Sequence, residues 1–446
     1  MKKIFYCLPF LLCISPVIAQ TVPQTIDELL KAYSNQYAFN GTVLVAQKGN
    51  VLLKKGYGFK NAASHSQNDE NTIFQIGSIT KQFTSAIILQ LQEKNLLSVQ
   101  DKLSKYISDY PDGDSITIEN LLTHTSGIFN YTNDESFMQT KASEPITLEH
   151  LIGLFKNKPL DFKPGKKYNY SNSGYILLGY IIEKVTGKSY FDVVRENIFQ
   201  PLHMDHSGFD FNGLKSPDKA VGYLKLTPKN SVPASIVDSS VSYAAGSIYT
   251  TVGDLYKWDQ ALYTDRIISS SSLQQAFTPH QSNYGYGWVI DSAYGKKAVM
   301  HEGGIFGFVS FIVRILADST CIILFDNRSS PGLAKIAEDI DAILNDQPYD
   351  FPMPRTEIEV DTAILRQYTG QYELRPGFVL TISLEDGQLV AQGTGQARIE
   401  LYPEKINFFF TKIIQAQIEF IRDPNGKTTR LTLYQGGQEL QAKKIK

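Results

Sequence analysis

The stretch GSITKQFTSAIILQL, residues 77–91, has apolar residues at helical spacing and predicts an amphipathic helix over residues 78–94. Its first turn holds Ser78 and Lys81, and residues three apart share one face of a helix. The positive end of the helix helps to lower the pKa of an amine and to stabilise a serine alkoxide. Because serine becomes a useful nucleophile only beside a base, Ser78 and Lys81 form a candidate pair of nucleophile and base. The same spacing recurs at Ser216 and Lys219, in a loop rich in Pro and Asp that no amphipathic helix follows, and we reject that copy.

A second base or proton shuttle is expected near the serine. Tyr170 and Asn172 come after a Pro-Gly pair and just before the helical pattern SGYILLGYIIEKV, so they are expected at a junction between a loop and a helix. A phenol flanked by ammonium groups could ionise more easily and relay the serine proton to a leaving group. Tyr131 and Asn133 repeat the spacing without the Pro-Gly approach and are the weaker candidate.

A third element is expected to line the cleft opposite the serine. His301, Gly303 and Gly304 end a predicted strand, and the glycines allow a substrate to approach the backbone closely. The Gly304 N–H is a candidate donor to an oxyanion. His206-Ser207-Gly208 has the same spacing in a predicted loop and is set aside.

The order of predicted elements favours an α+β domain over residues 20–345. Strands come first, many helices follow, and then strands and a last helix, predicted over residues 333–344, return. This order favours an antiparallel sheet closed by strands distant in sequence. Residues 346–355 contain three prolines and predict a linker. From 356 to 446, about eight short alternating runs separated by turn-forming residues predict a small antiparallel barrel or sandwich.

Taken together, the Ser-x-x-Lys, Tyr-x-Asn and His-x-Gly elements resemble the serine β-lactamase and penicillin-binding-protein superfamily. The branch most similar is that of the class C-like serine hydrolases, whose third motif has His where many relatives have Lys. The resemblance covers roughly residues 25 to 345. The tail resembles the lipocalin-like β domain often appended to these hydrolases. Further stretches similar to that branch are LLTHTSGI at 121–128, PLHMDHSGF at 201–209, AAGSIYTTVGDL at 244–255 and YGYGW at 284–288.

The resemblance implies a β-lactamase/transpeptidase-like fold and an acyl-enzyme mechanism without a cofactor. Ser78 would be the nucleophile, and Lys81 and Tyr170 would share the roles of base and acid; which is the base stays open. The N–H groups of Ser78 and Gly304 would form the oxyanion hole. Asn172, His301 and Gly303 would bind substrate, or tune the tyrosine.

The substrate class stays open among three alternatives. The first is a hydrolase of D-amino-acid peptides or related amides, the second an esterase or weak β-lactamase, and the third a ligand sensor without catalysis. Glu302 departs from the pattern, because many β-lactamases have Thr there. If its side chain faced the cleft, it would repel an anionic carboxylate.

The N-terminus predicts export. Residues 1–19 place two lysines before an apolar run broken by Pro9 and Pro16 and read as a signal peptide, so the protein is expected in the periplasm or outside the cell. No later run is long enough to span a membrane, and a net charge of -2 disfavours nucleic-acid binding. Cys321 is expected to be buried and inert. His203 and His206 lack further ligands, so we predict no metal site. The oligomeric state stays open.

Overall fold

The structure is a computed structural model that describes residues 20–36, 38–227, 230–329, 332–352, 355–396, 398–412, 416–435 and 438–446. The predicted signal peptide, 1–19, lies outside the described residues. Within the described ranges, no helix combines the length and the apolar character needed to cross a membrane.

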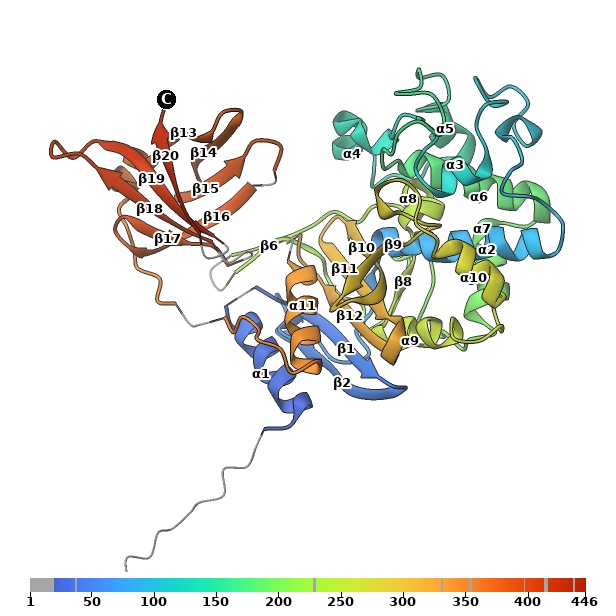
Figure 1. The fold of residues 1–446 in the computed structure, drawn as a ribbon, viewed down its shortest axis with the longest axis horizontal. Helices are drawn as coiled ribbons and strands as arrows, with labels where there is room; N and C mark the ends of the chain where they lie inside the picture. Colours follow the sequence, from blue (N-terminus) through green and yellow to red (C-terminus); the bar gives the residue numbers. More distant parts are fainter. Residues whose placement is uncertain are drawn as a thin grey trace, which may run out of the picture.

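A six-stranded antiparallel sheet forms the centre of the first domain, in the order β2-β1-β12-β11-β10-β9 (Figure 1). The first two strands are a hairpin from the start of the chain, and β1 pairs with β12, about 280 residues later, so that Val43 lies opposite Leu324. The predicted closure of the sheet by distant strands is therefore confirmed. The bounds are β1 Gly41–Gln47, β2 Asn50–Tyr57, β9 Val289–Ala293, β10 Lys296–Ile305, β11 Phe308–Ile315 and β12 Thr320–Asp326.

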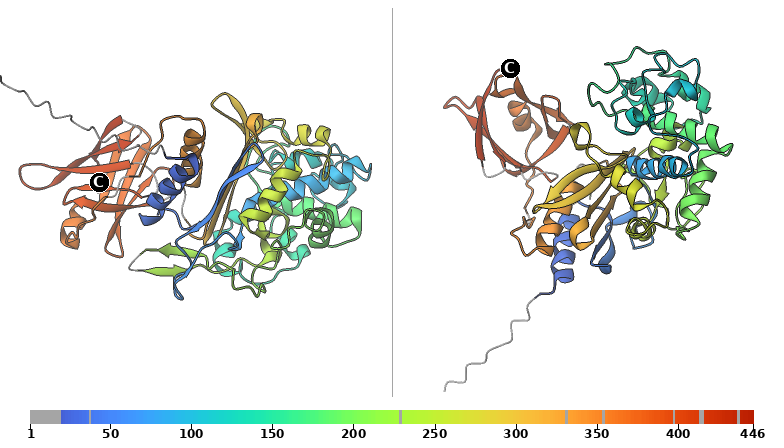
Figure 2. Two further views of the ribbon diagram at one scale, coloured as in Figure 1. Left: turned by 90° about the horizontal axis from the view of Figure 1, so that it is seen from below. Right: turned by 45° about the vertical axis from the view of Figure 1, so that its right-hand side comes forward.

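The two faces of the sheet bury two separate apolar cores, because alternate residues of a strand point to opposite faces. Val43 and Val45 pack on α1 (Val22–Asn35) and α11 (Leu333–Leu344), whereas Leu44 and Ala46 join the larger core on the other face. In α11 the residues that join this core recur at helical spacing and form one apolar stripe: Leu333, Ile336, Ala337, Ile340 and Ile343. Figure 2 shows α1 and α11 on the side of the sheet nearer the C-terminal domain.

The helices of the other face surround α2 (Thr80–Glu93), which is buried on nearly every side. A helix with such a surface has to lie inside a domain, and this one carries the candidate nucleophile at its start. The other helices of this region are α3 Ile118–Leu122, α4 Glu135–Thr140, α5 Leu148–Gly153, α6 Asn172–Thr186, α7 Tyr190–Val194, α8 Ser239–Gly246, α9 Val252–Ala261 and α10 Ser270–Ala276. Short strand pairs join them: β3 Phe59–Asn61 with β4 Ser66–Gln67, β5 Phe74–Gln75 with β8 Tyr249–Thr250, and β6 Tyr223–Leu226 with β7 Ser231–Pro233.

Strand β10 has a free edge where it passes the candidate nucleophile. Strand β9 pairs only with the first half of β10, and the last pair joins Met300 to Val289. From His301 to Ile305, β10 keeps β11 as its partner on one side. The backbone of this half-strand is therefore open to a ligand along its other side.

The C-terminal residues form a closed barrel of eight antiparallel strands, which decides between the predicted barrel and sandwich. Its interior is a separate apolar core that includes Tyr368, Tyr372 and Phe420. The short helix α12, Thr362–Leu365, precedes it and was not predicted from the sequence. The strands are β13 Gly370–Arg375, β14 Phe378–Glu385, β15 Gln388–Gly393, β16 Arg398–Lys405, β17 Phe408–Phe410, β18 Ala416–Arg422, β19 Thr428–Gln435 and β20 Gln438–Lys444.

Candidate active site

Ser78 lies in a single 3₁₀ turn, Gly77–Ile79, that leads directly into α2. Gly77 has φ +48°, and a Cβ there would come within 2.8 Å of the Gly304 nitrogen on β10. A Cβ at Gly303 would come within 2.0 Å of the Ile76 oxygen. Glycine at both positions therefore lets the end of β10 press against the turn that carries Ser78.

Lys81 is fully buried beneath Ser78, and its ammonium or amine nitrogen has three close partners. Lys81 Nζ lies 2.9 Å from Ser78 Oγ, 2.8 Å from Asn172 Oδ1 and 2.8 Å from the Ala245 carbonyl oxygen. Burial holds the pKa of Lys81 well below its usual value, because a charged amine loses its hydration there. The predicted direction of the shift is confirmed, although its cause is burial.

The three partners of Lys81 Nζ differ in what they can do. The carbonyl oxygens of Asn172 and Ala245 can only accept hydrogen bonds, so they take two N–H donors of the amine. A neutral amine has only two such donors, and its lone pair then faces the third partner, the hydroxyl of Ser78. The geometry is thus suited to moving the hydroxyl proton from Ser78 Oγ to Lys81 Nζ.

The Ala245 carbonyl is presented by a kink in α8. Tyr243 has φ +34° and ψ -130° inside that helix, which is a strained conformation for a residue with a side chain. Its hydroxyl donates to Glu183 Oε1 at 2.7 Å, while Thr84 Oγ1 donates to the Ala244 oxygen at 2.7 Å. These bonds hold the kink against α2, with the carbonyl of Ala245 directed at Lys81.

Tyr170 lies at the junction before α6, as predicted, and its hydroxyl hydrogen bonds with Ser78. Lys81 Nζ lies 4.9 Å from the centre of the Tyr170 ring. The expectation of an easily ionised phenol is wrong, since burial raises the pKa of Tyr170 above its ordinary value. One buried amine of lowered pKa offers too little positive charge to offset the loss of hydration, so Tyr170 rests as a neutral phenol.

Asn172 is held by the protein at both ends of its amide. Its Oδ1 accepts from Lys81, its Nδ2 donates to Thr132 Oγ1 at 3.1 Å, and its backbone N–H donates to Asn130 Oδ1 at 3.0 Å. Thr132 belongs to the Tyr131-Thr132-Asn133 segment that we ranked as the weaker copy of the motif. The segment is next to the site after all, as a support for Asn172.

His301 is buried and neutral. Its Nδ1 lies 2.6 Å from the Glu302 carbonyl oxygen, and its Nε2 lies 2.7 Å from the Tyr284 hydroxyl. Since a carbonyl can only accept, Nδ1 carries the proton and Nε2 accepts from Tyr284. Burial, with a further contribution from Lys81 when its amine is protonated, lowers the pKa of His301 to about 3, so this side chain offers no positive charge to a substrate at neutral pH.

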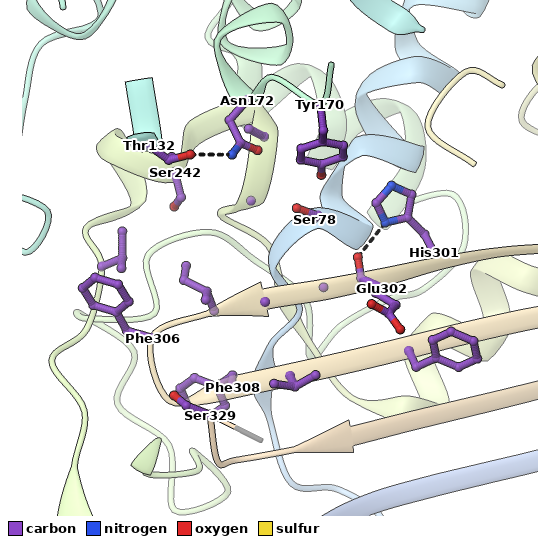
Figure 3. A pocket seen from close by; sticks show the side chains of 18 of the residues that line it. Ser78, Thr132, Tyr170, Asn172, Ser242, His301, Glu302, Phe306, Phe308 and Ser329 are labelled. Atoms are coloured by element: carbon purple, nitrogen blue, oxygen red, sulfur yellow. Dashed lines mark hydrogen bonds between the residues drawn. The ribbon is translucent and has the colours of Figure 1, made fainter. Parts of the chain in front are cut away.

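The Glu302 side chain lies on the opposite side of β10 from that of His301, because neighbouring residues of a strand alternate (Figure 3). It is paired across the sheet with Phe311 and still lines the pocket that contains Ser78. The walls of the pocket partly desolvate the Glu302 carboxylate and raise its pKa, although the side chain keeps access to solvent in the pocket.

One pocket of about 950 Å³ connects these groups. It passes from Ser78 and Tyr170 along the free half of β10, where Gly304 is exposed, and the other walls are mainly apolar. Among the described residues that line it there is no Lys or Arg; Lys81 lies below the floor. The lining includes Met138, Tyr168, Val237, Val241, Ile305 and Phe306.

The rejected motif copies lie elsewhere. Lys219 Nζ donates to the Asn212 oxygen at 3.2 Å, and Ser216 Oγ accepts from the Asp218 nitrogen at 3.1 Å. His206 donates its backbone N–H to Asp254 Oδ2. In the part of the chain that the structure describes, no three His, Cys, Asp or Glu side chains gather as a metal would require. Cys321 is buried in β12, as expected.

Two residues next to the site, His124 and Tyr284, were not predicted from the sequence to belong to it. His124, in the LLTHTSGI stretch, has its ring centre 4.1 Å from that of Tyr170, and its Nδ1 accepts from the Ser171 nitrogen. Tyr284 opens the YGYGW stretch and orients His301. The sequence did single out both stretches, but nothing in their spacing showed which of the aromatic side chains would turn inward.

Comparison with known proteins decides the family. The family model described as Beta-lactamase matches residues 26–345. The chain belongs to this family. A second model, a domain of unknown function (DUF3471), matches residues 354–444. Penicillin-binding protein 4* of Bacillus subtilis is 30% identical, with 94% of this chain and 98% of that protein covered. The putative penicillin-binding protein PbpX of the same organism is 33% identical over 73% of this chain and 80% of that protein.

Solved structures of the family are similar too. The octameric penicillin-binding protein homologue from Pyrococcus abyssi has a TM-score of 0.67 and 25% identity, covering 94% of this chain and 99% of that one. A D-stereospecific amidohydrolase from Streptomyces has a TM-score of 0.59 and 25% identity over 68% and 93%. D-amino acid amidase from Ochrobactrum anthropi shares the fold at 20% identity, with a TM-score of 0.65 over 73% and 98%. Membership of this family supports the assignment of the chain as a serine hydrolase.

Proposed function

We propose that this β-lactamase-family protein is an exported serine hydrolase that works through an acyl-enzyme on Ser78. The observation that carries the proposal is the set of three contacts at Lys81 Nζ, two of which can only accept hydrogen bonds. They leave the lone pair of a neutral amine for the Ser78 proton. Lys81 is therefore our candidate base, and Tyr170, a neutral phenol, is our candidate acid.

In acylation, protons would pass from Ser78 to Lys81, from Tyr170 to the leaving atom, and from Lys81 back to Tyr170. Lys81 Nζ takes the proton of Ser78 Oγ as that oxygen bonds to the substrate carbonyl carbon, whose oxygen becomes an oxyanion. The N–H groups of Ser78 and Gly304, on the turn and strand that press together, would stabilise it. Tyr170 gives its proton to the leaving atom as the bond to that atom breaks, and the Lys81 ammonium returns a proton to Tyr170.

Deacylation would use the same groups in reverse. Tyr170 takes a proton from water as the water oxygen attacks the ester carbon of the acyl-enzyme, and it passes its own proton to the neutral amine of Lys81. The water oxygen stays bonded to the carbonyl carbon as the acid product forms. Ser78 Oγ leaves and takes back a proton from the Lys81 ammonium. Asn172, fixed by Thr132, would keep Lys81 in place, and neutral His301 would shape the floor on which the substrate lies.

We propose D-amino-acid peptides or related amides as the substrate class. The support is the family, which includes relatives named for D-amino acid amides, together with a pocket whose described walls offer no fixed positive charge. Penicillin-like substrates carry a carboxylate, which such walls would not attract. The same walls suit uncharged esters, so an esterase is the second candidate.

The test of the acyl-enzyme is direct. The full chain, treated with a fluorophosphonate probe, should gain one adduct by intact mass, located on the peptide that contains Ser78. Ser78→Ala should gain none, and Ser216→Ala, from the rejected motif copy, should label like the wild type. Turnover of a D-phenylalanine p-nitroanilide is then compared with that of its L isomer and of a p-nitrophenyl ester. Faster turnover of the D isomer would support the amide class, and turnover of the ester alone would support the esterase. An adduct that persists in Ser78→Ala would overturn the assignment.

Export is proposed from residues 1–19 alone. N-terminal sequencing of the protein recovered outside the cytoplasm should begin at Gln20, and recovery only from the cytoplasm with Met1 intact would contradict it.

A further inference from the structure

The pocket has an arm on the side of β10 away from α2, which we name the Glu302 arm. Met300, Glu302, Val309, Phe311 and Ala334 line it. The strand register explains why these side chains meet. Glu302 lies opposite Phe311, Met300 is two residues earlier on the same face, and Val309 lies opposite Gly304. The arm is thus built by regular sheet geometry, with Ala334 of α11 at its back.

The Glu302 carboxylate is the only charged side chain among the described residues of this arm. It is open to the solvent in the pocket, and no hydrogen bond or ion pair joins it to a residue of the described chain. Half-buried acids of this domain have ion-pair partners, such as Asp27 with Lys55 and Asp318 with Lys296, whereas the exposed Glu302 has none among the described residues. An acid left without a partner among apolar walls attracts a cation that brings its own apolar stem.

We propose that the Glu302 arm binds a primary ammonium group carried on an alkyl chain of the substrate, so that the enzyme selects amides or peptides with a lysine-like side chain. The proposal rests on the proposed function, because the arm and Ser78 share one pocket. Methylene groups would lie on Met300, Val309 and Phe311, and the ammonium would bond to the carboxylate. A neutral chain of the same length would keep the apolar contacts of its methylene groups and lose the charge-assisted hydrogen bond to the carboxylate.

The test measures binding to the full-length protein without relying on catalysis. By titration calorimetry, the wild type should bind n-pentylammonium at least about tenfold more tightly than n-pentanol, its neutral counterpart. In Glu302→Gln this ratio should fall to about one. Glu338→Gln is the matched control, since Glu338 is an exposed acid on α11 that does not line the pocket, and it should keep the wild-type ratio.

A reversal of charge gives a second measurement. Glu302→Lys should lose n-pentylammonium binding and gain binding of n-pentanoate. A ratio near one in the wild type, or a wild-type ratio that survives in Glu302→Gln, would overturn the proposal. Labelling of Ser78 by the fluorophosphonate probe is measured on the same samples, so an unreactive Ser78 would count against the proposed hydrolase and not against the cation site.

Discussion

Two segments of this chain share the Ser-x-x-Lys spacing and differ in every physical respect that matters for catalysis. Ser78 and Lys81 lie at the start of a buried helix, and the amine contacts acceptors from α6 and α8. Ser216 and Lys219 lie in a loop, where the amine reaches a backbone oxygen and rests over the Phe211 ring. The spacing therefore brings a hydroxyl near an amine only where a helix follows, and distant elements decide what the amine can do.

The sharpest test of this difference removes the two amines in turn. Lys81→Ala should reduce turnover of a D-amino acid amide at least ~10³-fold, because it deletes the amine that is our candidate base for the Ser78 hydroxyl. Lys219→Ala should leave turnover unchanged. Both variants are compared by kcat/KM, with circular dichroism as the check of folding. Comparable losses in the two variants would show that burial of the amine is not what separates the copies.

The two roles at Ser78 can be separated through the leaving group. If Tyr170 gives a proton to the leaving atom, Tyr170→Phe should cost amide turnover ~10²- to 10³-fold, within the range for general acid catalysis. A p-nitrophenyl ester expels a stable phenolate and should lose less than about tenfold. Equal losses on both substrates would instead mean that Tyr170 serves the attack of Ser78, as a base or by positioning.

The pH dependence reports the state of the buried amine. The pKa of Lys81 is lowered by burial, and only the neutral amine can accept the proton, so acylation should rise with pH. Below the pKa of Lys81 the rate should fall about tenfold per pH unit, with the midpoint well below 10.5. His301, with a pKa of about 3, should add no step between pH 5 and 8.

This profile is measured with the uncharged fluorophosphonate probe on the wild type and on Lys219→Ala, which should give the same curve. A rate that decreases as pH rises through neutrality would contradict a neutral Lys81 as base.

A smaller effect is expected from the partner of His301. Tyr284→Phe removes the donor to the buried Nε2 atom and leaves that acceptor without a bond, at a cost of about 1–3 kcal/mol of stability. Turnover should fall by about tenfold as the end of β10 loosens. Tyr286→Phe is the control: its hydroxyl donates to Glu119 Oε1 at 2.6 Å, and its side chain does not line the pocket. A larger loss of turnover in Tyr286→Phe than in Tyr284→Phe would show that Tyr284 has no special role in the active site.

The sequence predicted elements well where a periodic pattern was long. The helix at 333–344 was predicted with its observed bounds, and the eight alternating runs of the tail became the eight strands of the barrel. It also predicted that Ser78, Tyr170 and His301 would line one pocket, because each adjoins a strong helix or strand, although the weaker copy at Tyr131 lines that pocket too. Strand β9 was missed, since its five residues alternate weakly and pair with only half of β10.

The pKa shifts and hydrogen-bond partners of the site could not be predicted from the sequence in the same way. The phenol of Tyr170 was expected to ionise easily, but the ring of His124 and the surrounding protein desolvate it, and these come from loops about 46 residues apart in sequence. Likewise, Asn172 has the spacing of a substrate ligand, yet its amide is already bonded to Lys81 and Thr132. Burial and bonding partners are properties of the assembled fold, and no local pattern contains them.

The smallest effect should come from removing the barrel. The barrel has its own apolar core, and the pocket around Ser78 is lined by residues no later than Ala334. Among the described residues, Lys225 of the first domain and Glu400 of the barrel form an ion pair at 3.0 Å. Both side chains are about 30% exposed, so this pair contributes at most about 1 kcal/mol. A chain ending at Asn345 should therefore label with the fluorophosphonate probe at a rate within about threefold of the full chain, and Lys225→Ala in the full chain should change the rate even less. If the shortened chain folds by circular dichroism but Ser78 no longer labels, the barrel completes the cleft, and the second domain has to be counted as part of the active site.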